Sequence, residues 1–110
     1  MPNTTEIVKT AREKARKVAP KLIDLSEKVV YGDVWERVEL SKRDRSLITV
    51  ASLMWMYRPE QLRLHLQRAL DNGVTQEEIG ELITHLAFYS GWPTAMTAAT
   101  IANEVFEAQE

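Results

Sequence analysis

The chain has 110 residues, of which 45% are hydrophobic and 27% charged, and its net charge at pH 7 is −2. This composition is typical of one globular domain and argues against a disordered chain. Cysteine is absent, which excludes a disulfide framework, a thiolate zinc site and thiol chemistry. No apolar run approaches the ~18 residues of a membrane span and no signal-peptide pattern opens the chain, so we expect a cytoplasmic protein.

Charge is divided unevenly between the two parts of the sequence. Residues 1–68 hold all 14 lysines and arginines against nine acids, whereas residues 69–110 hold seven acids and neither lysine nor arginine. A uniform basic face for nucleic acid is therefore not expected. Either the two parts pack with complementary charge, within or between chains, or the arginines converge on an anionic ligand.

Helical periodicity, with prolines and glycines at the segment ends, predicts about six helices and no sheet. The expected helices span about 4–18, 20–31, 42–57, 59–72, 75–90 and 93–107, with a short turn at 33–37. Thr75 and Glu78 form a capping-box pattern, and Asn72-Gly73 is a C-cap pair. We expect one all-α domain over residues 1–110, arranged as an orthogonal or antiparallel helical bundle.

The expected helix at 42–57 is unusually apolar. Between residues 47 and 57 only Thr49 and Ser52 are polar. A helix that is apolar on nearly all sides must be enclosed, and a monomer of this size has little material to enclose it. We therefore expect a homo-oligomer.

His65 is the first candidate for chemistry. It lies between Leu62 and Ala69 at the edge of an apolar stripe, where desolvation favours the neutral imidazole. A neutral imidazole can accept or donate a proton near neutral pH. The alternative is a core histidine whose ring is held by a backbone carbonyl.

A second candidate is the row Glu81, His85 and Tyr89, which the four-residue spacing places on one helix face. This row can make Glu81 and His85 a second acid–base pair, or it can be a polar rim beside a helix contact. Two histidines on separate helices, without the spacing of a ligand pair, give no basis for a metal site.

Four arginines flank the helices expected at 42–57 and 59–72, namely Arg43, Arg45, Arg58 and Arg63. Arg45 borders a very apolar segment, and a buried guanidinium needs a carboxylate partner. That partner is either a substrate carboxylate or a protein acid, such as Asp44 or an acid of the C-terminal part. Arg58 precedes a proline at a helix junction, where it either reaches a cleft or stays solvated.

The three tryptophans, Trp35, Trp55 and Trp92, are expected in the core or at an interface. Trp35 lies on a short irregular segment and is the one best placed to line a pocket. Ser46 has no histidine or aspartate at a helical spacing that would activate it as a nucleophile.

Several sequence blocks between residues 32 and 106 together match one protein family. They are GDVW (32–35), LSKRDRSLIT (40–49), LRLH (62–65), ALDNGVT (69–75), EI (78–79) and HLAFYSGWPTA (85–95). By these blocks the chain resembles the carboxymuconolactone decarboxylase family, an all-helical group that includes the alkylhydroperoxidase D-type proteins. The resemblance implies the alkylhydroperoxidase D-like fold, with N-terminal helices at 1–31 before a family core at 32–106.

The peroxidase branch of that family uses a glutamate, a Cys-x-x-Cys pair and a histidine. In this chain the corresponding positions hold Ser46, Arg58, Gln61 and His65. Because both sulfurs are missing, a disulfide-based peroxidase is excluded.

The decarboxylase branch is more similar, through Arg-Ser-Leu at 45–47, His65 and the turn YSGWP at 89–93, in which Ser90 is an added residue. The resemblance implies decarboxylation of a small cyclic carboxylate like 4-carboxymuconolactone in aromatic-compound degradation. It implies no metal or organic cofactor, and a homo-oligomer that is a hexamer (a trimer of dimers) or a trimer.

On this basis we expect Arg45 and Arg58 to bind substrate carboxylates, His65 to transfer a proton, and Trp35 and Tyr89 to shape the pocket. The expected partners are the small carboxylate and further copies of the chain, without nucleic acid or membrane. Two alternatives remain: a non-catalytic oligomeric helical protein of the same family, or another cofactor-free reaction such as isomerisation or lactone hydrolysis.

Overall fold

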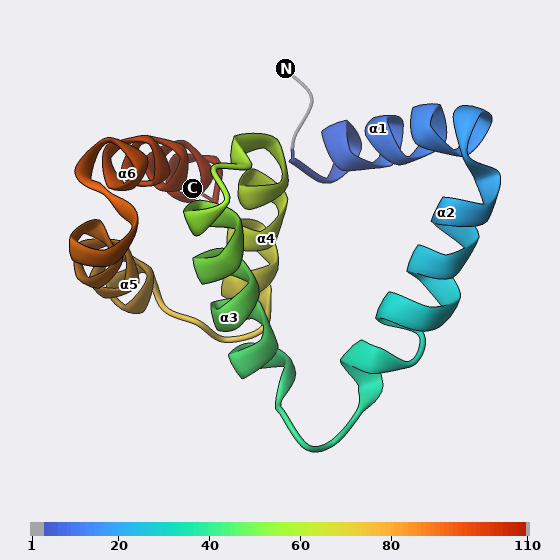
Figure 1. The fold of residues 1–110 in the computed structure, drawn as a ribbon, viewed down its shortest axis with the longest axis horizontal. Coiled ribbons are helices and arrows are strands. Elements are labelled where there is room, and N and C mark those ends of the chain that lie inside the picture. Colours follow the sequence, from blue (N-terminus) through green and yellow to red (C-terminus); the bar gives the residue numbers. More distant parts are fainter. Residues whose placement is uncertain (1–3, 110) are drawn as a thin grey trace. The chain divides into compact units, whose positions relative to one another are not determined.

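The computed structural model describes residues 4–109, and these residues form helices, turns and loops without a strand. The π-helical segment is named η1 and the single 3₁₀ turn η2. In chain order the elements are α1 (Thr4–Val18), α2 (Pro20–Leu25), η1 (Ser26–Tyr31), η2 (Val34–Glu36), α3 (Lys42–Trp55), α4 (Pro59–Asp71), α5 (Gln76–Ser90) and α6 (Trp92–Ala108) (Figure 1). The predicted all-α class is confirmed, and no described helix is long and apolar enough to cross a bilayer.

The chain divides into two compact units between Lys42 and Arg43. In the first unit α1 packs against α2, and η1 continues α2 with wider turns. Gly32 ends that segment, and a Cβ there would lie 2.7 Å from the backbone oxygen of Glu27, so only glycine fits. The single-domain organisation stays a prediction.

The first unit has polar contacts between its helices and little fully buried apolar surface. Arg12 donates a 3.3 Å hydrogen bond to Ser26 and lies 5.7 Å from the centre of the Tyr31 ring. Among the described residues of this unit, Ile23 is the one buried hydrophobic side chain. In the described part of the chain, the hydrophobic core therefore lies in the second unit.

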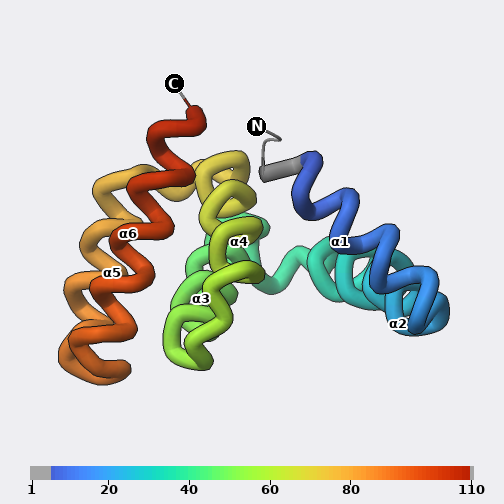
Figure 2. The backbone as a smooth tube through the Cα atoms, turned by 90° about the horizontal axis from the view of Figure 1, so that it is seen from above, coloured from blue at the N-terminus to red at the C-terminus, as the bar shows by residue number. Residues whose placement is uncertain are grey.

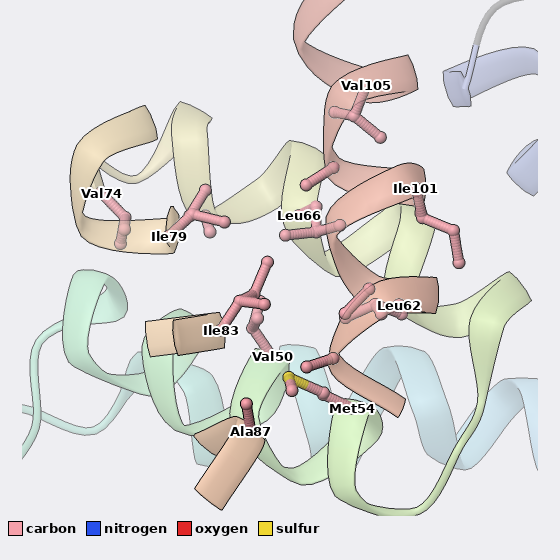
Figure 3. Close-up of a cluster of buried hydrophobic side chains, with 14 residues drawn as sticks. Val50, Met54, Leu62, Leu66, Val74, Ile79, Ile83, Ala87, Ile101 and Val105 are labelled. Atoms are coloured by element: carbon pink, nitrogen blue, oxygen red, sulfur yellow. The ribbon is translucent and has the colours of Figure 1, made fainter. Parts of the chain in front are cut away.

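The second unit consists of two antiparallel helical hairpins, α3–α4 and α5–α6 (Figures 1 and 2). Apolar side chains from all four helices converge in one cluster between them (Figure 3). The cluster consists of Val50, Met54, Leu62, Leu66, Ala69, Val74, Ile79, Ile83, Ala87, Ala95, Ala98, Ile101, Ala102 and Val105. Their spacing of three and four residues along each helix is the pattern that predicts these helices from the sequence.

Local signals fix the ends of these helices. The capping box of α5 is present: the Thr75 side chain accepts from the Glu78 backbone N–H at 3.0 Å, and Thr75 N–H donates to the Glu78 carboxylate at 2.9 Å. Gly91 adopts a φ of 107° between α5 and α6, a conformation that side-chain-bearing residues rarely take. This turn reverses the chain and sets α6 beside α5.

The helix predicted at 42–57 ends at Trp55, because Tyr57 adopts a left-handed φ of 55°. One face of α3 is buried, with Val50 and Met54 each 1% exposed. The other face is open, since Ile48 and Trp55 are 56% and 58% exposed. This chain alone does not enclose the apolar segment.

Candidate functional site

His65 lies on the buried face of α4, in the same row as Leu62, Leu66 and Ala69. Its residue exposure is 8%, and the leucine and alanine neighbours are 3% exposed or less. The i, i+3 and i+4 spacing explains this placement, because residues so spaced share one helix face. The imidazole is therefore largely removed from water.

Burial lowers the pKa of His65 from 6.5 to about 4, and the positive charge of Arg68, one turn later on α4, acts in the same direction. Both effects penalise the imidazolium form. The ring is therefore uncharged at neutral pH, as its position in the sequence predicts.

The two arginines expected at the site lie at the starts of their helices. Arg45 is partly buried in the first turns of α3, and its carbonyl accepts a 2.7 Å hydrogen bond from Thr49. Arg58 is exposed at the N-cap of α4, seven residues before His65. Of the two environments predicted for Arg58, this is the solvated one.

Two other arginines pair with acids in the second part of the sequence. Arg43 forms an ion pair with Glu78, and Arg63 forms one with Glu104. The hydrogen bond and charge of Glu78 raise the pKa of Arg43. For these pairs, the interpretation that the two parts of the sequence pack with complementary charge is confirmed.

A groove with a volume of about 480 Å³ runs between α3 and α5. Glu81 and His85 both line it, and the His85 and Tyr89 ring centres are 5.0 Å apart. The predicted row on α5 thus lies along one face, exposed and beside an apolar surface. The lining residues are Leu47, Ala51, Glu78, Glu81, Leu82, His85 and Leu86, so His65 is not among them.

The tryptophans differ in their surroundings. Trp35 is partly buried in the first unit, with its ring centre 5.8 Å from that of Tyr31. Trp55 and Trp92 are 58% and 61% exposed, so the expectation of a core position is wrong for both. An interface position stays a prediction for them.

Sequence reasoning missed two polar contacts near these residues. Asn72 donates a 2.9 Å hydrogen bond to the fully buried Ser46, which joins the end of α4 to the start of α3. Glu78, which caps α5 and lines the α3–α5 groove, also forms the ion pair with Arg43. The capping pattern locates Glu78 on the first turn of α5, but its partner Arg43 is 35 residues away in the sequence.

Comparison with known proteins gives the same family as the sequence blocks. The chain is 43% identical over 77 residues to a 4-carboxymuconolactone decarboxylase of Acinetobacter baylyi, covering 70% of this chain and 58% of that protein. It is 35% identical over 74 residues to the nitrosuccinic acid decarboxylase npaB of Metarhizium robertsii, covering 67% and 52%. The chain thus spans little more than half the length of these relatives.

The family model described as "Carboxymuconolactone decarboxylase family" matches residues 20–104, which include α2 to α5 and most of α6. Both relatives are decarboxylases by name, and the chain has no cysteine with which to act as a thiol peroxidase. The decarboxylase branch is therefore favoured over the peroxidase branch. The chain belongs to the carboxymuconolactone decarboxylase family.

Proposed function

We propose that this protein is a cofactor-independent decarboxylase of a small cyclic carboxylate, like 4-carboxymuconolactone, in aromatic-compound degradation. The observation that carries the proposal is the imidazole of His65, buried on α4 and uncharged at neutral pH. The names of the two relatives support the reaction class. A cytoplasmic location is part of the same proposal.

His65 supplies the proton in this proposal. A bound carboxylate near the ring stabilises imidazolium, because an opposite charge favours the charged form, so substrate binding raises the low pKa of His65. The carbon–carbon bond to the departing carboxylate then breaks, CO₂ leaves and the electron pair stays on the substrate carbon. The imidazolium protonates that carbon, and the neutral ring regains a proton from water with the next substrate.

The arginines hold the substrate in this proposal. A guanidinium matches a carboxylate with two parallel hydrogen bonds. Arg45, partly buried on α3, and Arg58, at the start of α4, are assigned to the carboxylates. Tyr89 is assigned to a wall of the pocket.

We also propose that the protein is a homo-oligomer, a hexamer or a trimer. Seven large apolar side chains near the α3–α4 and α5–α6 connections are each more than half exposed, and Figure 2 shows both connections at one end of the unit. At ~200 Å² for each fully exposed side chain, they present roughly 800–900 Å², as much as each partner of a standard interface. This apolar end consists of Trp55, Met56, Tyr57, Phe88, Tyr89, Trp92 and Met96.

The charge pattern supports association of identical surfaces. Residues 82–103 contain no Asp, Glu, Lys or Arg. On the α5–α6 side, two copies of the apolar end therefore meet with little repulsion from like charges. Light scattering of the purified chain measures the mass, and a monomer at micromolar concentration would contradict this part of the proposal.

The activity is tested by turnover of 4-carboxymuconolactone, with CO₂ release as the readout. His65→Gln and Arg45→Ala should each lower kcat/KM by about 100-fold or more, the usual contribution of a proton-transfer group or carboxylate anchor. His85→Gln is the matched control, because this histidine is exposed on another helix.

Circular dichroism and light scattering verify that each variant remains folded and assembled. Full turnover by folded His65→Gln would contradict the assignment of His65 as the proton donor. If His85→Gln lowers kcat/KM as much as His65→Gln does, the assignment of proton transfer to α4 alone would be contradicted. A wild-type chain that neither decarboxylates nor binds the lactone would favour the non-catalytic alternative.

A further inference from the structure

The α3–α5 groove has no part in the reaction proposed above. Its volume of about 480 Å³ lies within the ~300–1,000 Å³ range of small-molecule sites. Four aliphatic side chains, Leu47, Ala51, Leu82 and Leu86, form its apolar surface. Apolar walls with a few polar groups at one side are the usual composition of a ligand site.

The polar side of the groove carries surplus negative charge. Glu78 is already paired with Arg43, and a backbone hydrogen bond from Thr75 together with that guanidinium lowers the Glu78 pKa. Glu81 is exposed and has no ion pair within residues 4–109. α5 carries no lysine or arginine, and the guanidinium of Arg43 on α3 is already paired with Glu78. The charge around Glu81 therefore favours a cation over an anion.

One ring, that of His85, bounds the groove next to Glu81. His85 lines the groove one turn after Glu81, and the Tyr89 ring lies 5.0 Å from it between centres, tilted by 33°.

The structure disfavours a metal ion as the cation. Among the described residues, no three His, Asp or Glu side chains are grouped so that they could hold one. The apolar surface of the groove also offers no ligands to a hydrated metal ion, whereas it contributes binding energy to an alkyl or aryl group.

We infer that the α3–α5 groove binds a small organic monocation, an alkyl- or arylammonium ion whose apolar body lies on Leu47, Leu82 and Leu86. Its ammonium group pairs with Glu81 beside the His85 ring. This site differs in charge preference from the carboxylate site, so it is a second site and does not depend on the proposed reaction.

Benzyltrimethylammonium is the probe, titrated into the full chain and followed by NMR shifts of the probe and of the protein amides. Saturable binding should shift amides of α3 and α5, and Glu81→Gln should weaken the affinity about tenfold, as loss of a charge-assisted contact does. Glu77→Gln is the matched control, because Glu77 is exposed on the same helix but does not line the groove. This control should leave the affinity unchanged.

Benzyl alcohol and benzoate, which keep the ring but change the charge, should bind much more weakly than the cation. Equal binding of the three probes, or an unchanged affinity in Glu81→Gln, would overturn the inference. The inference is also overturned if the probe gives no saturable shifts, as it would if a second copy of the chain covers the groove. Each of these outcomes leaves the decarboxylase proposal standing, since that proposal is tested at His65.

Discussion

The buried histidine should make stability depend on pH in a defined window. The pKa of His65 is about 4 in the folded chain and 6.5 in the unfolded reference. Above pH 6.5 the ring is neutral in both states and adds no pH dependence. As the pH falls from 6.5 to 4 the unfolded chain binds a proton that the folded chain does not, so the folded state loses stability. At 1.36 kcal/mol per pKa unit the loss reaches about 3 kcal/mol near pH 4.

His65→Gln isolates this contribution, because glutamine keeps a polar side chain of similar size without a titration. Urea unfolding of both proteins from pH 7.5 to 4, at one fixed protein concentration, gives the difference in unfolding free energy at each pH. The other ionisable groups are the same in both proteins and cancel. Between pH 7.5 and 4 the wild type should lose about 3 kcal/mol more unfolding free energy than His65→Gln does.

His85→Gln, at an exposed histidine, is the control and should give a nearly flat difference. Parallel pH curves for wild type and His65→Gln would refute the reasoning, since they would mean that the folded chain protonates His65 as readily as the unfolded one.

Three further predictions concern the fold and its assembly. Thr75→Ala removes a hydrogen bond of the α5 capping box and should lower the unfolding free energy by about 1 kcal/mol, measured by urea titration. Met54→Ala leaves a cavity at a side chain only 1% exposed and should cost ~2–5 kcal/mol, whereas a cost below 1 kcal/mol would contradict its place in the core. Trp92→Glu puts a charge on a 61% exposed ring of the apolar end and should lower the mass measured by light scattering. Thr100→Glu, at an exposed position later on α6, should leave the mass of the assembly unchanged. An unchanged mass in both variants would refute the assignment of the apolar end as the interface.

The helices could be predicted from the sequence because their signals are local. Apolar spacing, the Thr75 capping box and the prolines at helix starts all act within a few residues. Two features escaped prediction. The π-helical turns at Ser26–Tyr31 have more residues per turn than an α-helix, and a segment of six residues is too short to show this change in the spacing of its apolar residues. Tyr57 adopts a left-handed conformation at a position without the glycine or asparagine that usually signals one.

The site could be predicted only in part, because its features depend on packing between helices. Burial of His65 follows from its position in the α4 stripe, so its neutral ring could be predicted. The pairing of Arg43 with Glu78 joins α3 to α5 across 35 residues, and no local pattern selects this acid among the seven in residues 69–110. The α3–α5 groove escaped prediction for the same reason, although the row of Glu81, His85 and Tyr89 could be identified, and the first two of these residues line the groove.

The exposure of Arg58 and Tyr89 connects the proposed assembly with the proposed chemistry. An ion pair to a solvated guanidinium contributes at most about 1 kcal/mol, because water screens it and the side chain loses freedom. Arg58 is exposed at the α3–α4 connection, and Tyr89 belongs to the apolar end. A second copy that covers this end would remove water from both residues and strengthen the contact with a substrate carboxylate. The two proposals therefore support each other, since the surface that favours self-association also carries two of the residues assigned to substrate binding.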